Sequence, residues 1–172
     1  MADAVDTLKS EHRIIEKVLE ALDLAAQRDM PATFYERAID FLSAFADKCH
    51  HGKEEDRLFP CLELCGIPRE MGPIGVMCAE HVQGRAHIRR MREHLQLGRI
   101  DDLRRESLEY TALLWQHIRK EDLILFEMAR HVVGPADARK LSREFDEADG
   151  AARPQEKWGA VADALLAEAR GA

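Results

Sequence analysis

Long apolar runs and strand-like alternation are both missing from this sequence. No uninterrupted apolar segment reaches about 18 residues, which excludes a membrane-spanning helix. No convincing alternation of polar and apolar residues occurs, and no hairpin turn, which excludes a β-sheet fold. The remaining composition, 46% hydrophobic and 33% charged, is typical of a globular, soluble protein and not of a disordered one.

The sequence also lacks a surplus of positive charge. Its 25 Lys and Arg residues against 32 Asp and Glu residues leave a net charge of −7. Electrostatics therefore gives no support for a nucleic-acid partner. The nearest basic patch, which we interpret as a solvated helix face, consists of Arg85, Arg89, Arg90 and Arg92.

No export signal and no cysteine pair with metal-binding spacing is present. Residues Met1–Asp6 have neither a basic start nor an apolar run, so we expect a cytoplasmic protein without a membrane partner. The cysteines are then expected to be reduced thiols, and none has the Cys-x2-Cys spacing of a zinc site. We interpret them as small core residues, with redox sensing as the alternative: Cys49, Cys61, Cys65 and Cys78.

Glycine and proline occur in few places, and they divide the chain into helical segments. Thr33 followed by Glu36 predicts a capping box at the start of the second segment, and Asp101 is expected to cap the fourth. Gly98 is expected to end the third. The predicted helices cover residues 6–28, 33–65, 74–97, 101–133, 136–149 and 156–170.

Four of these helices are long and are joined by short connections. This pattern predicts an all-α, up-down-up-down four-helix bundle over residues 1–133. Residues 134–172 are expected to form one or two extra C-terminal helices packed on the same domain.

The most informative motif is a histidine followed four residues later by a glutamate, which occurs twice. His50 and Glu54 form the first pair, and His117 and Glu121 form the second. A four-residue step places both side chains on one helix face. Imidazole and carboxylate groups that point into a bundle form half of a metal site, so two such pairs predict a dinuclear centre.

The lengths of the connections place four histidines in two layers. His12 and His50 each lie 19 residues from Pro31, the centre of the first connection. His81 and His117 each lie 18 residues from Arg99, the centre of the third. With the middle connection centred near Arg69, His81 is level with residue 57, about two turns from His50. At about 1.5 Å per residue the two layers are about 10 Å apart.

Both glutamates, Glu54 and Glu121, fall between these two histidine layers. We therefore predict two metal ions, each held by two histidines, with both glutamates bridging the ions. The predicted ligands are His12, His50, Glu54, His81, His117 and Glu121.

A second four-residue step, from His51 to Glu55, competes with the step from His50 to Glu54. It lies about 100° further around the helix, so at most one of the two pairs is expected to face the centre. His51 remains an alternative as an outer partner or an occasional ligand. We interpret the other polar residues of this kind as surface or outer groups: Glu16, His87, His94 and His131.

Nitrogen ligands combined with carboxylate ligands favour iron or manganese. Zinc tolerates the same ligand types, but it gives no reason for a symmetric pair of sites.

The motifs resemble those of the hemerythrin-like, HHE cation-binding proteins. The segment from His50 to Pro60 resembles the second-helix motif of the family, and His117–Glu121 resembles the fourth. The segment from Met71 to His81 is similar to the third-helix motif of the subgroup that includes the iron-centre repair proteins. Glu11 and His12 resemble the first-helix motif.

This resemblance implies two iron ions in a four-helix bundle, bridged by the two glutamates and by an oxo or hydroxo group. It implies the same six ligands that the helix register predicts. The chain departs from the oxygen-carrying hemerythrins at Arg85, where those proteins have a further histidine four residues after the one at His81. The departure puts reversible oxygen carriage in doubt and leaves an open position at the metal.

The expected function is therefore the binding of O2, peroxide or nitric oxide at a His4Glu2 di-iron site. One alternative is an enzyme, either catalase-like or nitric-oxide-reducing, or an iron donor for cluster repair. The other alternative is a redox or oxygen sensor in which the C-terminal helices report the state of the site.

Overall fold

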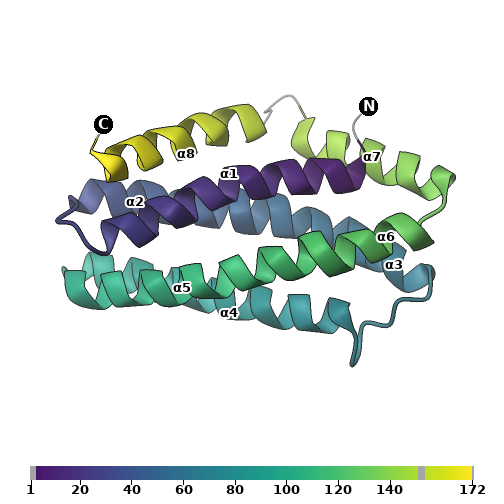
Figure 1. The fold of residues 1–172 in the computed structure, drawn as a ribbon, viewed down its shortest axis with the longest axis horizontal. Helices are drawn as coiled ribbons and strands as arrows, with labels where there is room; N and C mark the ends of the chain where they lie inside the picture. The colour runs from purple at the N-terminus through teal and green to yellow at the C-terminus, as the bar shows by residue number, and fades with distance from the viewer. Residues whose placement is uncertain (1–2, 151–153, 172) are drawn as a thin grey trace.

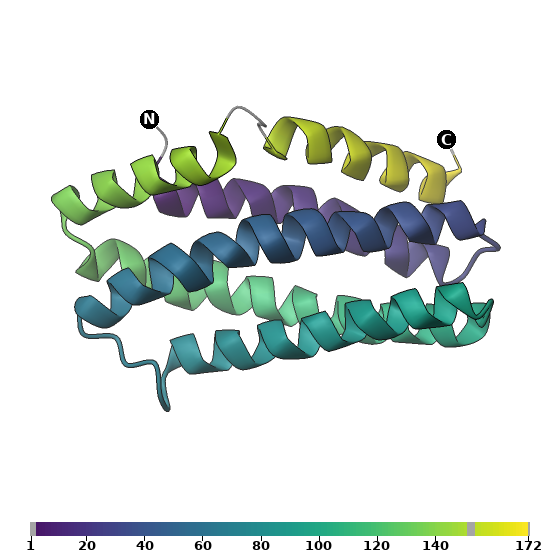
Figure 2. The same ribbon diagram turned by 180° about the vertical axis from the view of Figure 1, so that it is seen from behind.

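Four antiparallel helical rods form the body of the protein in the computed structural model, which describes residues 3–150 and 154–171 (Figures 1 and 2). All regular elements in these residues are helical, which confirms the predicted fold class. The first rod is α1 (Ala4–Ala25), and the third is α4 (Pro73–Gln96). The second comprises α2 (Ala32–Phe41), η1 (Leu42–His51), η2 (Glu54–Leu58) and α3 (Phe59–Leu64). The fourth comprises α5 (Ile100–Lys120), η3 (Glu121–Leu125) and α6 (Phe126–Val132).

The segments η1, η2 and η3 are π-helical, whereas the sequence predicted uninterrupted α-helices. A π-turn closes its hydrogen bond over five residues instead of four, so successive side chains are separated by a smaller angle than in an α-helix. Such turns are rare and occur often at functional sites. Three of the four residues of the two histidine–glutamate motifs lie in these segments: His50 in η1, Glu54 in η2 and Glu121 in η3.

Two predicted helix caps are wrong. The second rod begins at Ala32, where Pro31 is the capping residue and no side chain makes a capping hydrogen bond. The Pro31 carbonyl instead accepts a hydrogen bond from the Phe34 N–H at 3.0 Å. Asp101 lies inside the first turn of α5, which also has no side-chain cap. Its negative charge still suits the positive end of the helix dipole.

A glycine lies near each end of the third rod. Gly98 follows the end of α4 with a φ of 66°, a left-handed conformation that ends a helix, as the sequence predicted. At the start of α4, a Cβ on Gly75 would lie 2.4 Å from the carbonyl oxygen of Arg69. This close approach of the preceding loop explains why glycine is needed at that position.

Two apolar cores fill the bundle, one on each side of a polar layer. One core contains Ile15 and Phe45, and the other contains Leu8 and Phe126. On α1, His12 lies between Leu8 of one core and Ile15 of the other. The polar layer is therefore enclosed along the bundle axis by hydrophobic side chains at both ends.

Two further helices, α7 (Pro135–Asp149) and α8 (Pro154–Arg170), run along α1 on the outside of the four rods (Figure 1). Phe145 of α7 joins one apolar core, and Leu165 of α8 joins the other. The extension thus shares the cores of the bundle. The domain boundary after residue 133 stays a prediction.

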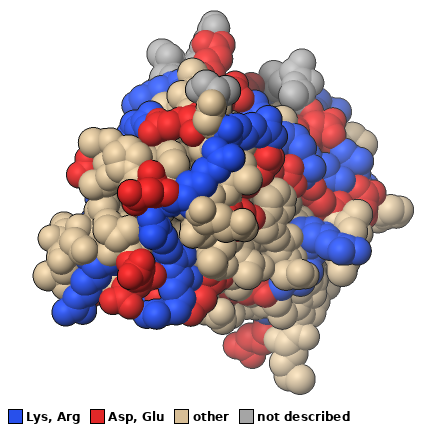
Figure 3. All heavy atoms as spheres, turned by 60° about the vertical axis from the view of Figure 1, so that its left-hand side comes forward, with Lys and Arg blue, Asp and Glu red and all other residues tan. Residues whose placement is uncertain are grey.

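The surface carries mixed charges, and none of the described helices has the length and apolar character needed to cross a membrane. On the face drawn in Figure 3, basic and acidic side chains lie next to each other. The expected arginine patch is broken up in this way, since Arg90 pairs with Glu106 at 2.7 Å and Arg92 with Asp40 at 3.2 Å.

Candidate metal centre

The polar layer contains the four histidines predicted from the helix register. Each of them has at most 1% of its surface exposed. The ring centroids of His12 and His50 are 4.6 Å apart, and those of His81 and His117 are 4.8 Å apart. One histidine therefore comes from each of the four rods, and they lie in the two predicted pairs.

The two fully buried glutamates connect these pairs. The carboxylate of Glu54 lies 3.5 Å from Nε2 of His50 and 3.4 Å from Nε2 of His81. One oxygen of Glu121 lies 3.2 Å from Nε2 of both His12 and His117. Each glutamate thus spans from one histidine pair to the other, in the order that the sequence predicted.

Each of the four histidines directs its other ring nitrogen, Nδ1, toward a carboxylate on a different rod. This contact fixes the orientation of the ring and keeps Nε2 directed at the centre, as in many metal sites. The pairs are His12 with Asp122 at 2.7 Å, His50 with Glu11 at 2.9 Å, His81 with Glu55 at 2.7 Å and His117 with Glu80 at 2.9 Å.

A basic side chain stands behind each of these outer carboxylates. The positive charges of these side chains balance the negative charges of the outer carboxylates. They therefore do not balance the charges of the central glutamates, Glu54 and Glu121. The contacts join Asp122 to Arg13, Glu11 to Lys53, Glu55 to Arg85 and Glu80 to Lys120.

The inner atoms of the layer fit a bound cation. Within the described residues, Nε2 of His12, Nε2 of His50 and all four carboxylate oxygens of Glu54 and Glu121 are buried without a hydrogen-bond partner. Buried polar atoms are rarely left unsatisfied, and a metal ion is one of the standard explanations. Nε2 of His81 and Nε2 of His117 are 3.1 Å apart. Two nitrogens bound at right angles to one ion, each at about 2.1 Å, would be about 3.0 Å apart.

The electrostatics of the layer also favours positive charge at its centre. Burial opposes protonation of His12 and His117, but neighbouring carboxylates outweigh it and raise their pKa values to about 9 and about 10. Glu121 is among these neighbours of both rings. Burial alone would raise the pKa of Glu121, yet the charges of His117 and His12 hold it well below its usual value.

His51, which the sequence left open as an outer partner or an occasional ligand, also reaches the layer. It is 4% exposed, and its ring stacks on that of His81 with centroids 3.9 Å apart. One ring nitrogen of His51 groups with ligand atoms of Glu54, His81 and His117, all within 4.8 Å of one another. Glu55 lies on the outer side, so only one of the two pairs faces the centre as a pair, but both histidines reach the layer. The smaller angle between successive residues in the π-helical η1 is the physical reason.

The pKa of His51 is lowered, whereas the pKa values of His12 and His117 are raised. Burial and the charges of His81 and His117 lower it well below its usual value, so this ring is neutral. Glu55, the other member of the competing motif, contacts Nδ1 of His81 from the outer side.

The role of the outer carboxylates was not predicted, although all four follow or precede a predicted ligand directly. Glu55 follows Glu54. Glu11 precedes His12, Glu80 precedes His81, and Asp122 follows Glu121. Acidic residues adjacent to ligands could have indicated them. Their histidine partners lie on other rods, however, and the sequence does not show that pairing.

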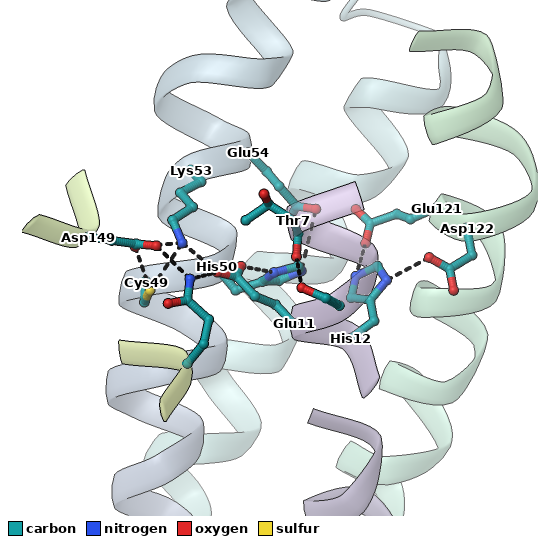
Figure 4. A network of polar contacts seen from close by, with 12 residues as sticks. Thr7, Glu11, His12, Cys49, His50, Lys53, Glu54, Glu121, Asp122 and Asp149 are labelled. Carbon is teal, nitrogen blue, oxygen red and sulfur yellow. Dashed lines mark hydrogen bonds and ion pairs between the residues drawn. The ribbon is translucent and has the colours of Figure 1, made fainter. Parts of the chain in front are cut away.

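Glu11 is the centre of a buried network that extends to the C-terminal helices (Figure 4). It contacts Lys53 at 2.5 Å and Gln155 of α8 at 2.6 Å. Lys53 also pairs with Asp149, the last residue of α7, at 2.6 Å. The pKa of Glu11 falls to about 2, because His50 and Lys53 outweigh the effect of its burial. A surface cavity of about 310 Å³ lies beside Lys53 and Asp149.

The remaining histidines and the cysteines lie outside the layer. His87 contacts Glu106 at 2.6 Å, and His131 contacts the Glu127 carbonyl. All four cysteines are free thiols. Burial raises the pKa of Cys49 to about 12 and that of Cys61 to about 11, which leaves both thiols protonated and unreactive at neutral pH.

A four-rod helical bundle with buried histidine and glutamate groups at its centre fits a cation-binding protein. The model of the hemerythrin HHE cation-binding domain matches residues 3–129 of the 172 residues. The chain therefore belongs to the hemerythrin HHE cation-binding domain family, as its motifs predicted. No curated protein and no solved structure matches the chain.

The raised pKa values predict how the stability of the metal-free protein depends on pH. Protonated His12 and His117 stabilise the fold fully below pH 6.5, and this contribution is lost as the pH rises toward 9–10. The low pKa of Glu121 acts in the opposite direction, so its contribution is lost as the pH falls below 4.5. We expect the melting temperature of the chelator-treated protein to fall between pH 6.5 and pH 10.

Thermal unfolding followed by circular dichroism measures this dependence, with the metal-loaded protein as the comparison. The loaded protein is expected to show a smaller decrease, because its histidines are already deprotonated and an ion supplies the positive charge. A melting temperature of the metal-free protein that stays constant from pH 6.5 to pH 10 would contradict the raised pKa values of His12 and His117.

Proposed function

We propose that this chain binds two iron ions in the polar layer and that small ligands, O2, peroxide or nitric oxide, bind at them. The observation that supports the proposal best is the set of buried inner atoms without hydrogen-bond partners, which face one another across the bundle. The proposed metal ligands are His12, His50, Glu54, His81, His117 and Glu121.

The mixture of imidazole and carboxylate ligands supports iron or manganese over zinc. Iron would supply reversible electron transfer and an open coordination position for a small ligand. The chain itself supplies neutral Nε2 atoms, because each Nδ1 proton is held by an outer carboxylate. Glu54 and Glu121 span the two histidine pairs and would bridge the ions. The two apolar cores keep bulk water away from the layer along the bundle axis.

The ligand assignment predicts that Glu54→Ala and Glu121→Ala each lose most of the bound iron, because each removes a bridge between both ions. His87→Ala is the control, since His87 is a histidine outside the layer. Elemental analysis of the purified variants gives the number of ions per chain. Full iron content in both glutamate variants would defeat the assignment.

The iron-loaded protein is expected to change its optical spectrum on addition of peroxide, nitric oxide or O2. Binding without consumption of the ligand would support a binding or sensing protein. Turnover of peroxide or of nitric oxide would support the enzyme alternative, either catalase-like or nitric-oxide-reducing. Transfer of iron to an acceptor protein would support cluster repair. A spectrum that none of the three ligands changes would overturn the proposed ligand binding.

A second candidate function, a redox sensor, is supported by the network around Glu11. Glu11 joins His50 to Lys53, and Lys53 joins the network to Asp149 at the end of α7. A change in charge at the metal would alter the hydrogen bond from His50 and hence the contacts of the C-terminal helices. In this candidate, α7 and α8 report the state of the site.

Hydrogen exchange can test this coupling. We expect metal loading to slow amide exchange in α7 of the natural protein, and Lys53→Met to remove that difference. Lys17→Met is a matched control, because Lys17 pairs with Asp163 of α8 at 2.6 Å on the surface, away from the layer. Equal exchange in α7 with and without metal in the natural protein would rule out the sensor candidate.

A further inference from the structure

Arg85 lies on α4 one turn after His81. A histidine at this position would give the site a fifth histidine ligand, the second from α4. Nε of Arg85 donates a hydrogen bond to Asp47 at 2.8 Å, and its guanidinium also contacts Glu55. Both partners are carboxylates that lie near histidines of the layer. Arg85 is therefore a charge partner of the outer carboxylates and supplies no ligand.

His51 occupies the space beside His81 on the neighbouring rod. Besides stacking on His81 at 17° between ring planes, it meets the ring of His117 edge-on, with centroids 5.5 Å apart. Nδ1 of His51 is buried without a hydrogen-bond partner among the described residues. It lies 3.6 Å from Asp47, and Arg85 holds that carboxylate.

The surroundings of His51 repeat those of the four predicted histidine ligands. Each of those has an outer carboxylate on Nδ1 and a cation behind the carboxylate, and His51 has Asp47 and Arg85 in the same order. The contact with Asp47 is longer than a hydrogen bond, so a small movement of the ring is needed to complete it. That leaves the other ring nitrogen for the centre.

We propose that His51 is a fifth histidine ligand and that it binds the ion held by His81, His117 and Glu54. This inference rests on the proposed dinuclear site. It makes the two ions unequal, because one is held by three histidines and the other by His12 and His50 alone. The ion with fewer protein nitrogens has the open position, so the small ligand binds on the side of His12 and His50.

The test is His51→Phe, which keeps an aromatic ring to stack on His81 but removes both nitrogens. His87→Phe is the matched control, because His87 also packs edge-on against an aromatic ring, that of Tyr110, but outside the layer. Ferrous iron is added without oxygen, and its two dissociation constants are measured by competition with a chelator. Mössbauer spectra of the same samples, loaded with the isotope 57Fe, report the environment of each iron.

We expect His51→Phe to weaken the binding of one iron by about 10–100-fold or more, the range found when groups that support a metal site are removed. The Mössbauer signal of one iron should change more than that of the other. Unchanged affinities and unchanged spectra in His51→Phe would overturn the role of His51. If the natural protein and His87→Phe themselves fail to bind two irons, the proposed dinuclear site fails instead.

Thermal unfolding of the metal-free variants separates loss of a ligand from loss of the fold. If His51→Phe does not fold, His51→Gln is measured in the same way, because glutamine is smaller and polar. Normal iron affinities and spectra in folded His51→Gln would then overturn the proposal, and weakened binding of one iron would support it.

Discussion

Two negative charges buried in the middle of an apolar bundle impose the main constraint on this structure. Glu54 and Glu121 are both fully buried, and an ionised carboxylate in such a place is costly unless positive charge accompanies it. The four outer cations cannot serve, because each is already paired with an outer carboxylate. Positive charge must therefore come from protons on the central histidines or from metal ions, and the two alternatives compete for the same Nε2 atoms.

The rods are also joined to one another through this layer. Each outer carboxylate stands next to a layer residue in the sequence but holds a histidine from a different rod. Glu11, beside His12 on α1, holds His50 of the second rod, and Asp122 of the fourth rod holds His12. Each rod carries one layer histidine and one outer carboxylate that holds the histidine of another rod. A shift of one rod would therefore displace its own histidine and also release the histidine of the neighbouring rod. The cross-connections therefore explain how four separate helices can keep donor atoms within a few ångströms of their partners.

Much of this arrangement could be predicted from the sequence because helix register is a local property. Equal numbers of residues on either side of Pro31 placed His12 and His50 side by side, and short connections required antiparallel neighbours. The position of His51 could not be predicted in this way, because the π-turns depend on tertiary packing that changes the angle between neighbouring side chains. The contacts between the outer carboxylates and the histidines could not be predicted, because the partners lie 26–110 residues apart in the sequence.

The C-terminal helices are connected to only one of the layer histidines, His50, through Lys53 and Glu11. They lie outside residues 3–129, which match the family model, yet Asp149 and Gln155 reach Lys53 and Glu11. Through Glu11 they act on His50 alone among the layer histidines. A carboxylate held more tightly by a lysine attracts the imidazole proton less strongly, which makes the opposite ring nitrogen a weaker metal ligand. If the proposed ion at His12 and His50 has the open coordination position, the extension is connected to the ion at which we propose that the small ligand binds. The contacts of α7 and α8 with Lys53 and Glu11 would thus adjust ligand binding, although neither helix contacts the ligand itself.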